Sequence, residues 1–344
     1  MKRTACGWKT CGFSRAFPTI IVLLAAAMVV TGCRKRADHP TAPLETLTLA
    51  YASLPHASLV HVALAKGFFA DEGLKVNPQA HAFGKPALGA VLQGQADLAT
   101  VAETPVMFAI LSGKKICIAA VIETSSRNNA IIGRKDLGIG SLRDLKGKTV
   151  GVALGSNGEF VLDAFLTAQG IGRGDVNATN MTPDEMLEGL LAGKIAAAVI
   201  WNPTLARIRE ALGEKGAVFY GEELYTENFC VAATQEFTKK RPAAVRNVLK
   251  ALIRAEDFVK GHPEEARNLV AEFLKMDKTV LHDIWADFRF KVTLDRSLLV
   301  TIEDESRWAI KNRLVESQTM PNYLDFLYAD ALSSVKPERL RIIR

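Results

Sequence analysis

The sequence predicts an α/β protein with two lobes, each a mixed, mostly parallel sheet flanked by helices, and a helical C-terminal region. Three observations predict this class. Short apolar runs alternate with helical patterns from residue 46 onward, the alternation restarts near residue 142, and the patterns over 242–332 are helical. The length of 344 residues leaves room for two lobes.

The first alternation runs from residue 46 to residue 133. Gly94 and Gly113 each follow an expected helix directly, where glycine commonly ends a helix. Pro86 stands in the first turn of its helix, where the missing N–H of proline costs little. We expect strands over 46–52, 74–76, 97–101, 116–122 and 130–133, and helices over 57–66, 86–93 and 105–112.

The second alternation covers residues 142–233, and a helical region follows it. Thr182 and Glu185 form the pattern of a capping box, which marks the start of a helix. We expect strands over 149–154, 196–201, 217–220 and 229–233, and helices over 142–146, 157–169, 183–192 and 203–212. The C-terminal helices are expected over 242–260, 263–274, 278–288, 297–314 and 323–332.

The composition is that of a globular protein, with 49% hydrophobic and 23% charged residues. The formal net charge is +6, but residues 1–32 carry four basic residues and no acidic one. Subtracting these four leaves about +2 for the rest of the chain. Because this charge is small and no basic stripe is visible, we expect no nucleic-acid partner.

The N-terminus has the three parts of an export signal: a basic stretch, an apolar run over 17–30, and small residues before Cys33. Val30-Thr31-Gly32-Cys33 resembles a bacterial lipobox, in which the cysteine is lipidated. We therefore expect a lipoprotein signal peptide over 1–32, lipidation of Cys33 and a polar tether over 33–44. The alternatives are a plain secretory signal and a transmembrane helix, for which the run is short because a span needs about 20 residues.

The five cysteines agree with this interpretation. Cys6 and Cys11 leave with the signal, and Cys33 is acylated. Cys117 and Cys230 each stand in an apolar run, which favours two unpaired, buried thiols over a disulfide.

Candidate binding residues follow from the expected strands, because ligands of open α/β sheets bind beyond the carboxyl ends of the strands. The turn at 155–158 is the most suggestive, since it follows a strand and opens a helix, whose free N–H groups favour an anionic group. Simple helix capping is the alternative for this turn. The candidates are Ser53, Leu54, His56, Glu103, Thr104, Thr124, Ser125, Gly155, Ser156, Asn157, Trp201 and Asn202.

Catalytic patterns are missing from the sequence. The spacing of His56 and His61 takes them off a common helix face, and the paired carboxylates fall in turns or first helical turns. The turn at 155–158 matches neither a P-loop nor a dinucleotide fingerprint. We expect no catalytic residue, no metal site and no cofactor.

Several short segments, in order along nearly the whole mature chain, carry a family resemblance. They are 65–69, 92–99, 144–152, 190–198 and Trp201-Asn202-Pro203. The chain resembles the nitrate/sulfonate/taurine type of ABC-transporter substrate-binding proteins, which have the type II periplasmic binding fold. This resemblance implies that lobe 1 comprises 45–129 and 234–344, that lobe 2 comprises 130–233, and that a ligand binds between them by hinge closure without chemistry.

The resemblance also implies the partners. They are a small anionic or polar solute of the sulfonate, nitrate or taurine kind, an ABC permease with its ATPase, and the extracytoplasmic face of a membrane through the lipid on Cys33; a monomer is expected. Relatives often have Trp-Glu-Pro at 201–203, so Asn202 removes a partner for a substrate ammonium group unless Glu103 replaces it. Lys85 and Arg127 are the cations near candidate loops. The alternatives are an enzyme of thiamine or menaquinone precursor metabolism and a sensory ligand-binding protein.

Overall fold

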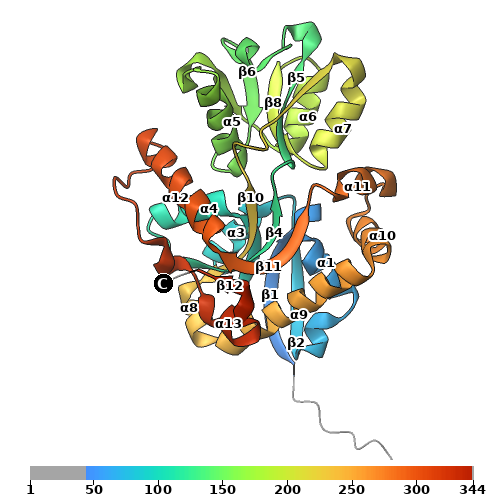
Figure 1. Cartoon of the computed structure of the whole chain (residues 1–344), viewed down its shortest axis with the longest axis vertical. Coiled ribbons are helices and arrows are strands. Elements are labelled where there is room, and N and C mark those ends of the chain that lie inside the picture. Colours follow the sequence, from blue (N-terminus) through green and yellow to red (C-terminus); the bar gives the residue numbers. More distant parts are fainter. Residues whose placement is uncertain (1–43, 343–344) are drawn as a thin grey trace, which may run out of the picture. The chain divides into compact units, whose positions relative to one another are not determined.

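Two β-sheets, each with helices packed on it, make up the described part of the chain (Figure 1). The computed structural model describes residues 44–342, so the expected signal peptide, Cys33 and the tether up to residue 43 lie outside the described residues. Within 44–342, no helix combines the length and apolar character that crossing a membrane requires. The two-lobed α/β class is confirmed.

The larger sheet has seven strands in the order β12-β11-β4-β10-β3-β1-β2. β1 pairs parallel with β2 and β3, whereas β10 runs antiparallel to β3 and β4. The central strands are buried along nearly their whole length, which explains why they are continuous apolar runs in the sequence. The bounds are β1 (Glu45–Ala52), β2 (Leu74–His81), β3 (Leu98–Ala102), β4 (Ile116–Ser125), β10 (Glu227–Thr234), β11 (Arg289–Asp295) and β12 (Leu340–Arg341).

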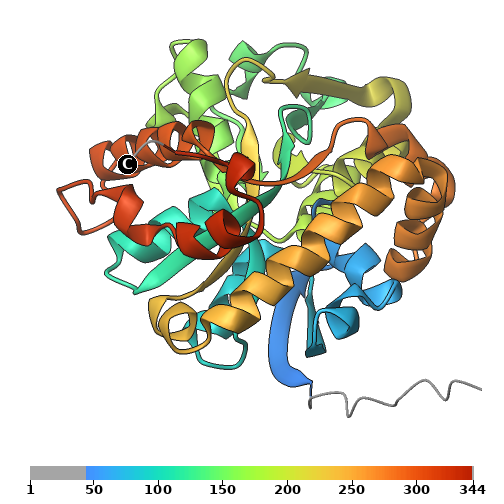
Figure 2. The ribbon, with the colours of Figure 1, turned by 60° about the horizontal axis from the view of Figure 1, so that its bottom comes forward.

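Ten α-helices of the described chain lie in the same parts of the sequence as the strands of the larger sheet. The longest, α9 (Pro242–Gly261), packs against α1, α2, α10 and α13, and Figure 2 shows it in gold between the blue N-terminal helices and the red C-terminal ones. Its buried residues Val245, Val248, Leu249 and Leu252 recur at spacings of three and four, so they form one apolar stripe. The others are α1 (Ser58–Ala65), α2 (Phe68–Asp71), α3 (Gly84–Leu92), α4 (Glu103–Leu111), α8 (Gln235–Lys240), α10 (Pro263–Leu274), α11 (Lys278–Trp285), α12 (Arg296–Lys311) and α13 (Ala329–Val335).

The smaller sheet has five strands in the order β7-β6-β8-β5-β9. Its helices are α5 (Asn157–Ala168), α6 (Pro183–Leu191) and α7 (Thr204–Leu212). The expected capping box of Thr182 and Glu185 is present at the start of α6. The strand bounds are β5 (Asn129–Arg134), β6 (Thr149–Val152), β7 (Asn177–Asn180), β8 (Ala197–Trp201) and β9 (Gly216–Tyr220).

The chain passes between the sheets twice, over 126–128 from β4 to β5 and over 221–226 from β9 to β10. The sequence analysis placed residues 229–233 in lobe 2, with the boundary after 233. In the structure β10 is hydrogen-bonded to β3 and β4 of the larger sheet, so the second crossing comes before residue 227. That each sheet moves as a separate lobe stays a prediction.

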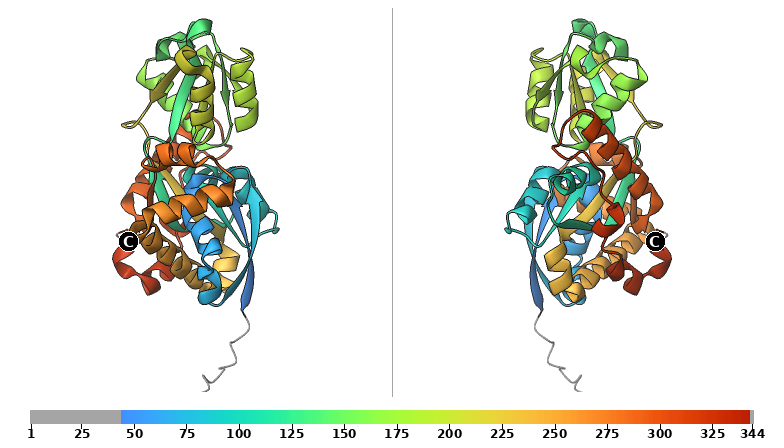
Figure 3. Two further views of the ribbon diagram at one scale, coloured as in Figure 1. Left: turned by 90° about the vertical axis from the view of Figure 1, so that its right-hand side faces the viewer. Right: turned by 90° about the vertical axis from the view of Figure 1, so that its left-hand side faces the viewer.

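The C-terminal region was expected to be wholly helical, but it contains a strand. Residues 289–295 form β11, which pairs with β4, and Figure 3 shows the orange and red C-terminal segments beside the larger sheet. Phe290, Val292 and Leu294 are buried, whereas Arg289, Lys291 and Asp295 are more exposed; this is the period of a strand, and the buried Thr293 departs from it. The helix expected over 323–332 is a 3₁₀ turn, η6 (Tyr323–Phe326), followed by α13.

Candidate functional site

A buried polar cluster lies where the chain crosses between the sheets. His56 stands on a 3₁₀ turn, η1 (Pro55–Ala57), just after β1, and Asn128 ends the first crossing. Asn129 begins β5, Asn157 begins α5, and Glu227 begins β10. All five side chains belong to buried residues, so the cluster draws on both sheets and both crossings.

The carboxylate of Glu227 is the centre of this cluster. Its Oε2 accepts hydrogen bonds from the Nδ2 atoms of Asn128, Asn129 and Asn157, at 3.0, 2.6 and 3.1 Å. Its other oxygen, Oε1, lies 3.4 Å from Nε2 of His56. Three amide donors on one oxygen stabilise a negative charge in a place from which water is excluded.

The orientation of Asn128 fixes the protonation of His56. The Oδ1 atom of Asn128 accepts the backbone N–H of Asn202 at 3.1 Å, so its Nδ2 faces the histidine, 2.6 Å from Nε2. Because an amide nitrogen can only donate, Nε2 of His56 must be the acceptor and carry a lone pair. Burial lowers the pKa of His56, which agrees with a neutral ring, while Glu227 opposes that shift.

Three more buried glutamates lie near this cluster: Glu103, Glu123 and Glu305. Glu103 accepts the hydroxyl of Tyr225 at 2.7 Å and the backbone N–H of Asn228 at 3.0 Å. Burial raises the pKa of all three carboxyl groups, and the negative charges of the neighbouring glutamates raise it further. These three carboxyl groups therefore keep their protons to a higher pH than exposed glutamates do.

A cavity of about 20 Å³ borders the cluster, with Glu227 and His56 on its wall. The rings of Phe83, Trp201 and Phe229 also line it, and the first two lie 5.8 Å apart. A space of this size holds about one water molecule, so a solute needs the surrounding segments to part before it enters.

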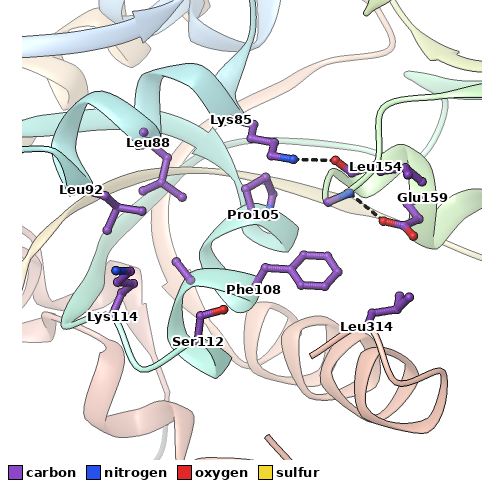
Figure 4. A pocket seen from close by; sticks show the side chains of 13 residues that line it. Lys85, Leu88, Leu92, Pro105, Phe108, Ser112, Lys114, Leu154, Glu159 and Leu314 are labelled. Carbon is purple, nitrogen blue, oxygen red and sulfur yellow. Dashed lines mark hydrogen bonds between the residues drawn. The ribbon is translucent and has the colours of Figure 1, made fainter. Parts of the chain in front are cut away.

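A groove of about 540 Å³ lies next to the cavity and shares Lys85 and Pro105 with it. Figure 4 shows Lys85 reaching across the groove, where its Nζ donates to the carbonyl of Leu154 at 2.6 Å. This bond ties α3 of the larger sheet to the turn before α5. Apolar side chains, among them Leu88 and Phe108, line much of the remaining wall.

Five of the twelve candidate residues line the cavity: Leu54, His56, Ser156, Asn157 and Trp201. The hydroxyl of Ser156 is engaged as the N-cap of α5, since its Oγ accepts the N–H of Gly158 at 3.1 Å and donates to the carbonyl of Ala153 at 2.7 Å. The structure thus shows Ser156 as a helix cap, which is the alternative that the sequence analysis considered for this turn. Solute contact by these residues stays a prediction.

The other seven candidates lie elsewhere. Gly155 lines the neighbouring groove at a φ of 70°, which glycine adopts readily. Asn202 is buried beside Asn128, and Ser53 is exposed. The remaining four do not line the cavity: Glu103 is bonded to Tyr225, Thr104 to Glu305, Thr124 lies within β4, and Ser125 caps the turn after it.

The sequence analysis did not select Glu227, Asn129 or Glu123. A signal for two of them was present, because an acidic residue at the start of an apolar run or inside one is rarely buried without a specific partner. Glu227 precedes the run at 229–233, and Glu123 stands at the end of the run at 116–122.

The two thiols of the described chain, Cys117 and Cys230, are free and buried, as expected. Burial raises the pKa of Cys117 to about 11 and that of Cys230 well above its ordinary value. Neither is therefore a candidate nucleophile, because the thiolate is the reactive form.

A comparison with protein-family models matches residues 55–266, more than half of the chain, to the family described as NMT1/THI5 like. The chain belongs to this family. Among curated relatives of this NMT1/THI5-like protein, one from Bacillus subtilis named for binding aliphatic sulfonates is 27% identical over 274 residues, 77% of this chain and 81% of its own length. The riboflavin-binding protein RibY of Chloroflexus aurantiacus is 25% identical over 278 residues, 74% of this chain and 76% of its own length.

Among solved structures, the NMT1/THI5-like chain is similar to the periplasmic aliphatic sulphonate binding protein SsuA of Escherichia coli. The TM-score is 0.67 at 21% sequence identity, covering 80% of this chain and 95% of that protein. The similarity establishes the periplasmic binding protein fold that the sequence predicted.

Proposed function

We propose that this protein is an extracytoplasmic solute-binding protein that holds a small polar solute between its two sheets and delivers it to an ABC importer. One observation carries the proposal. Glu227 of the larger sheet is hydrogen-bonded by Asn129 and Asn157 of the smaller one, beside a cavity walled by aromatic rings. A few fixed polar groups among apolar walls are typical of small-molecule sites.

The curated relatives support binding rather than catalysis. One is named for aliphatic sulfonates and another for riboflavin, and both cover about three quarters of this chain. Because these names cover different chemistries, they support the class of function and leave the solute to be inferred from the site.

The charges at the cavity favour a solute with a hydrogen-bond donor or an ammonium group. Glu227 stands on the wall and can receive such a group, which is the role considered for Glu103 in the sequence analysis. Among the described residues that line the cavity, Lys85 is the basic one that can face an anionic group. A zwitterion of the taurine kind would place its ammonium group on Glu227 and its sulfonate toward Lys85 and the start of α5. A bare anion such as nitrate would be repelled by the carboxylate of Glu227 on the cavity wall.

The N-terminal segment supports the location. The lipobox ending in Cys33 predicts an anchor outside the cytoplasm, and the polar tether after it would hold the folded body near a permease. The proposed partners are accordingly an ABC permease and its ATPase.

Exchange of Ser156 and Asn157 for alanine tests the proposal. The full chain is screened by thermal shift against taurine, methanesulfonate, nitrate and aminopyrimidines, since a bound ligand raises apparent stability. We expect the double variant to bind the best solute at least about tenfold more weakly, equal to about 1.4 kcal/mol. Thr234→Ala, which removes the N-cap of α8, is the matched control and should bind normally. Equal affinity of the double variant and the wild type in calorimetry would remove the helix start from the site.

A further inference from the structure

We propose that His56, Glu123 and Glu227 form a binding site for a divalent transition-metal ion behind the wall of the cavity. The site shares Glu227 with the proposed solute contacts and rests on that function only there, and its test uses metal ions alone, without any solute. Solute binding and metal binding can therefore fail independently of each other.

The three side chains converge from three places in the fold. His56 follows β1, Glu123 lies in β4, and Glu227 starts β10. Their exposed fractions are 1%, 0% and 2%, and one donor atom from each lies within 4.8 Å of the other two. Two of the residues, His56 and Glu227, also line the cavity, so an ion would enter from that side once the surrounding segments part.

The contact between His56 and Glu227 has the spacing of two ligands on one ion. The single lone pair of Nε2 of His56 accepts from Asn128, and Oε1 of Glu227 lies 3.4 Å from Nε2, so an ion bound to both atoms would displace the hydrogen bond from Asn128. An ion bonded to both at about 2.1 Å in tetrahedral geometry separates its ligands by about 3.4 Å.

Glu123 supplies the second, independent observation. It is fully buried, and neither of its carboxylate oxygens has a hydrogen-bond partner among the described residues. A buried carboxylate without a partner is costly, and buried charges in proteins are normally paired or coordinate a metal. The charged groups of the described residues that act on Glu123 are the carboxylates of Glu227 and Glu103, which are acidic as well.

The donor set indicates the kind of ion. One imidazole nitrogen with two carboxylates suits Zn²⁺, Mn²⁺ or Co²⁺ better than Mg²⁺ or Ca²⁺, which prefer oxygen ligands alone. When an ion takes Nε2 of His56, Asn128 gives up its bond to the histidine and can keep its bond to Oε2 of Glu227, from which it holds that carboxylate in place. With three protein ligands, a fourth position is left for water or for part of a solute.

The test begins with the full chain, purified in detergent and stripped of metal with EDTA. Equilibrium dialysis and calorimetry with Zn²⁺ and Mn²⁺ then measure stoichiometry and affinity. We expect about one ion per chain, and an affinity at least about tenfold lower in Glu123→Gln. Glu305→Gln is the matched control, since it removes another buried glutamate that contacts Thr104 instead of the site. Its affinity should equal that of the wild type.

Cobalt spectroscopy keeps the test decisive if Glu123→Gln does not fold. Co²⁺ added to the stripped wild-type chain should give the intense visible bands of a four- or five-coordinate site, and these should disappear when Zn²⁺ is added. Absence of stoichiometric binding in the wild type would overturn the proposal and leave Glu123 neutralised by a proton. Equal affinity of Glu123→Gln and the wild type would overturn it too, because the ions would then be bound elsewhere.

Discussion

His61 offers a quantitative test of how burial acts on a charge in this fold. The side chain lies on α1 with no exposed surface, stacked on Phe273 at 4.7 Å and against the edge of Tyr51 at 5.5 Å. Burial lowers its pKa from 6.5 to about 3. At a pH between these two values, His61 is protonated in the unfolded chain and neutral in the folded chain. The stability from this residue is therefore complete above about pH 6.5 and is lost as the pH falls toward 3.

The size of the effect follows from the distance to the unfolded pKa. A pH of about 5 lies about 1.5 units below the unfolded pKa of 6.5. Each unit corresponds to about 1.4 kcal/mol, so the free energy of unfolding falls by about 2 kcal/mol. Leucine has a similar volume and cannot bind a proton. Urea denaturation of the wild type and His61→Leu at about pH 7.5 and pH 5 should show the wild type losing about 2 kcal/mol more between the two conditions. Equal losses would refute the reasoning, whatever the absolute stabilities are.

Two further predictions concern the contact between the sheets and the anchor. Nε1 of Trp308 on α12 donates to Oδ2 of Asp163 on α5 at 2.7 Å, so Trp308→Phe should lower the free energy of unfolding by about 1–2 kcal/mol while the edge contact with Phe160 remains. An unchanged urea midpoint would show that this bond contributes nothing. Cys33→Ser should move the protein from the membrane fraction to the soluble fraction, and the lipid anchor is ruled out if the variant still sediments with membranes.

Most of the fold could be predicted because its strands are continuous apolar runs and its helices carry ordinary start and stop signals. The exceptions have physical reasons. β7 (Asn177–Asn180) is a polar edge strand with no apolar period to detect. β11 has the alternation of a strand, but it follows four helices and joins the sheet beside a distant strand, β4, which chain order does not reveal.

The site could be predicted in part. The residues that sequence reasoning missed, Glu227 and Asn129, were missed for the same reason. Sequence reasoning searched the carboxyl ends of strands, and this found His56 and Trp201. β10 and β5 run antiparallel to their neighbours, so their first residues lie at that same edge: Glu227 pairs with Ser125, and Asn129 with Trp201. The rule for parallel strands overlooks such positions, because strand direction is known only once the pairing is known.

The position of Glu227 immediately after a crossing has a mechanical consequence. In a rigid rotation, an atom moves in proportion to its distance from the axis. Asn128, Asn129 and Glu227 lie at the ends of the two crossings, so a rotation about these segments would leave their mutual bonds nearly undisturbed. Asn157 begins α5 and does not adjoin either crossing in the chain, so we expect its bond to Glu227 to break first. The contacts of Glu227 with Asn128 and Asn129 would thus persist while the contact with α5 is open.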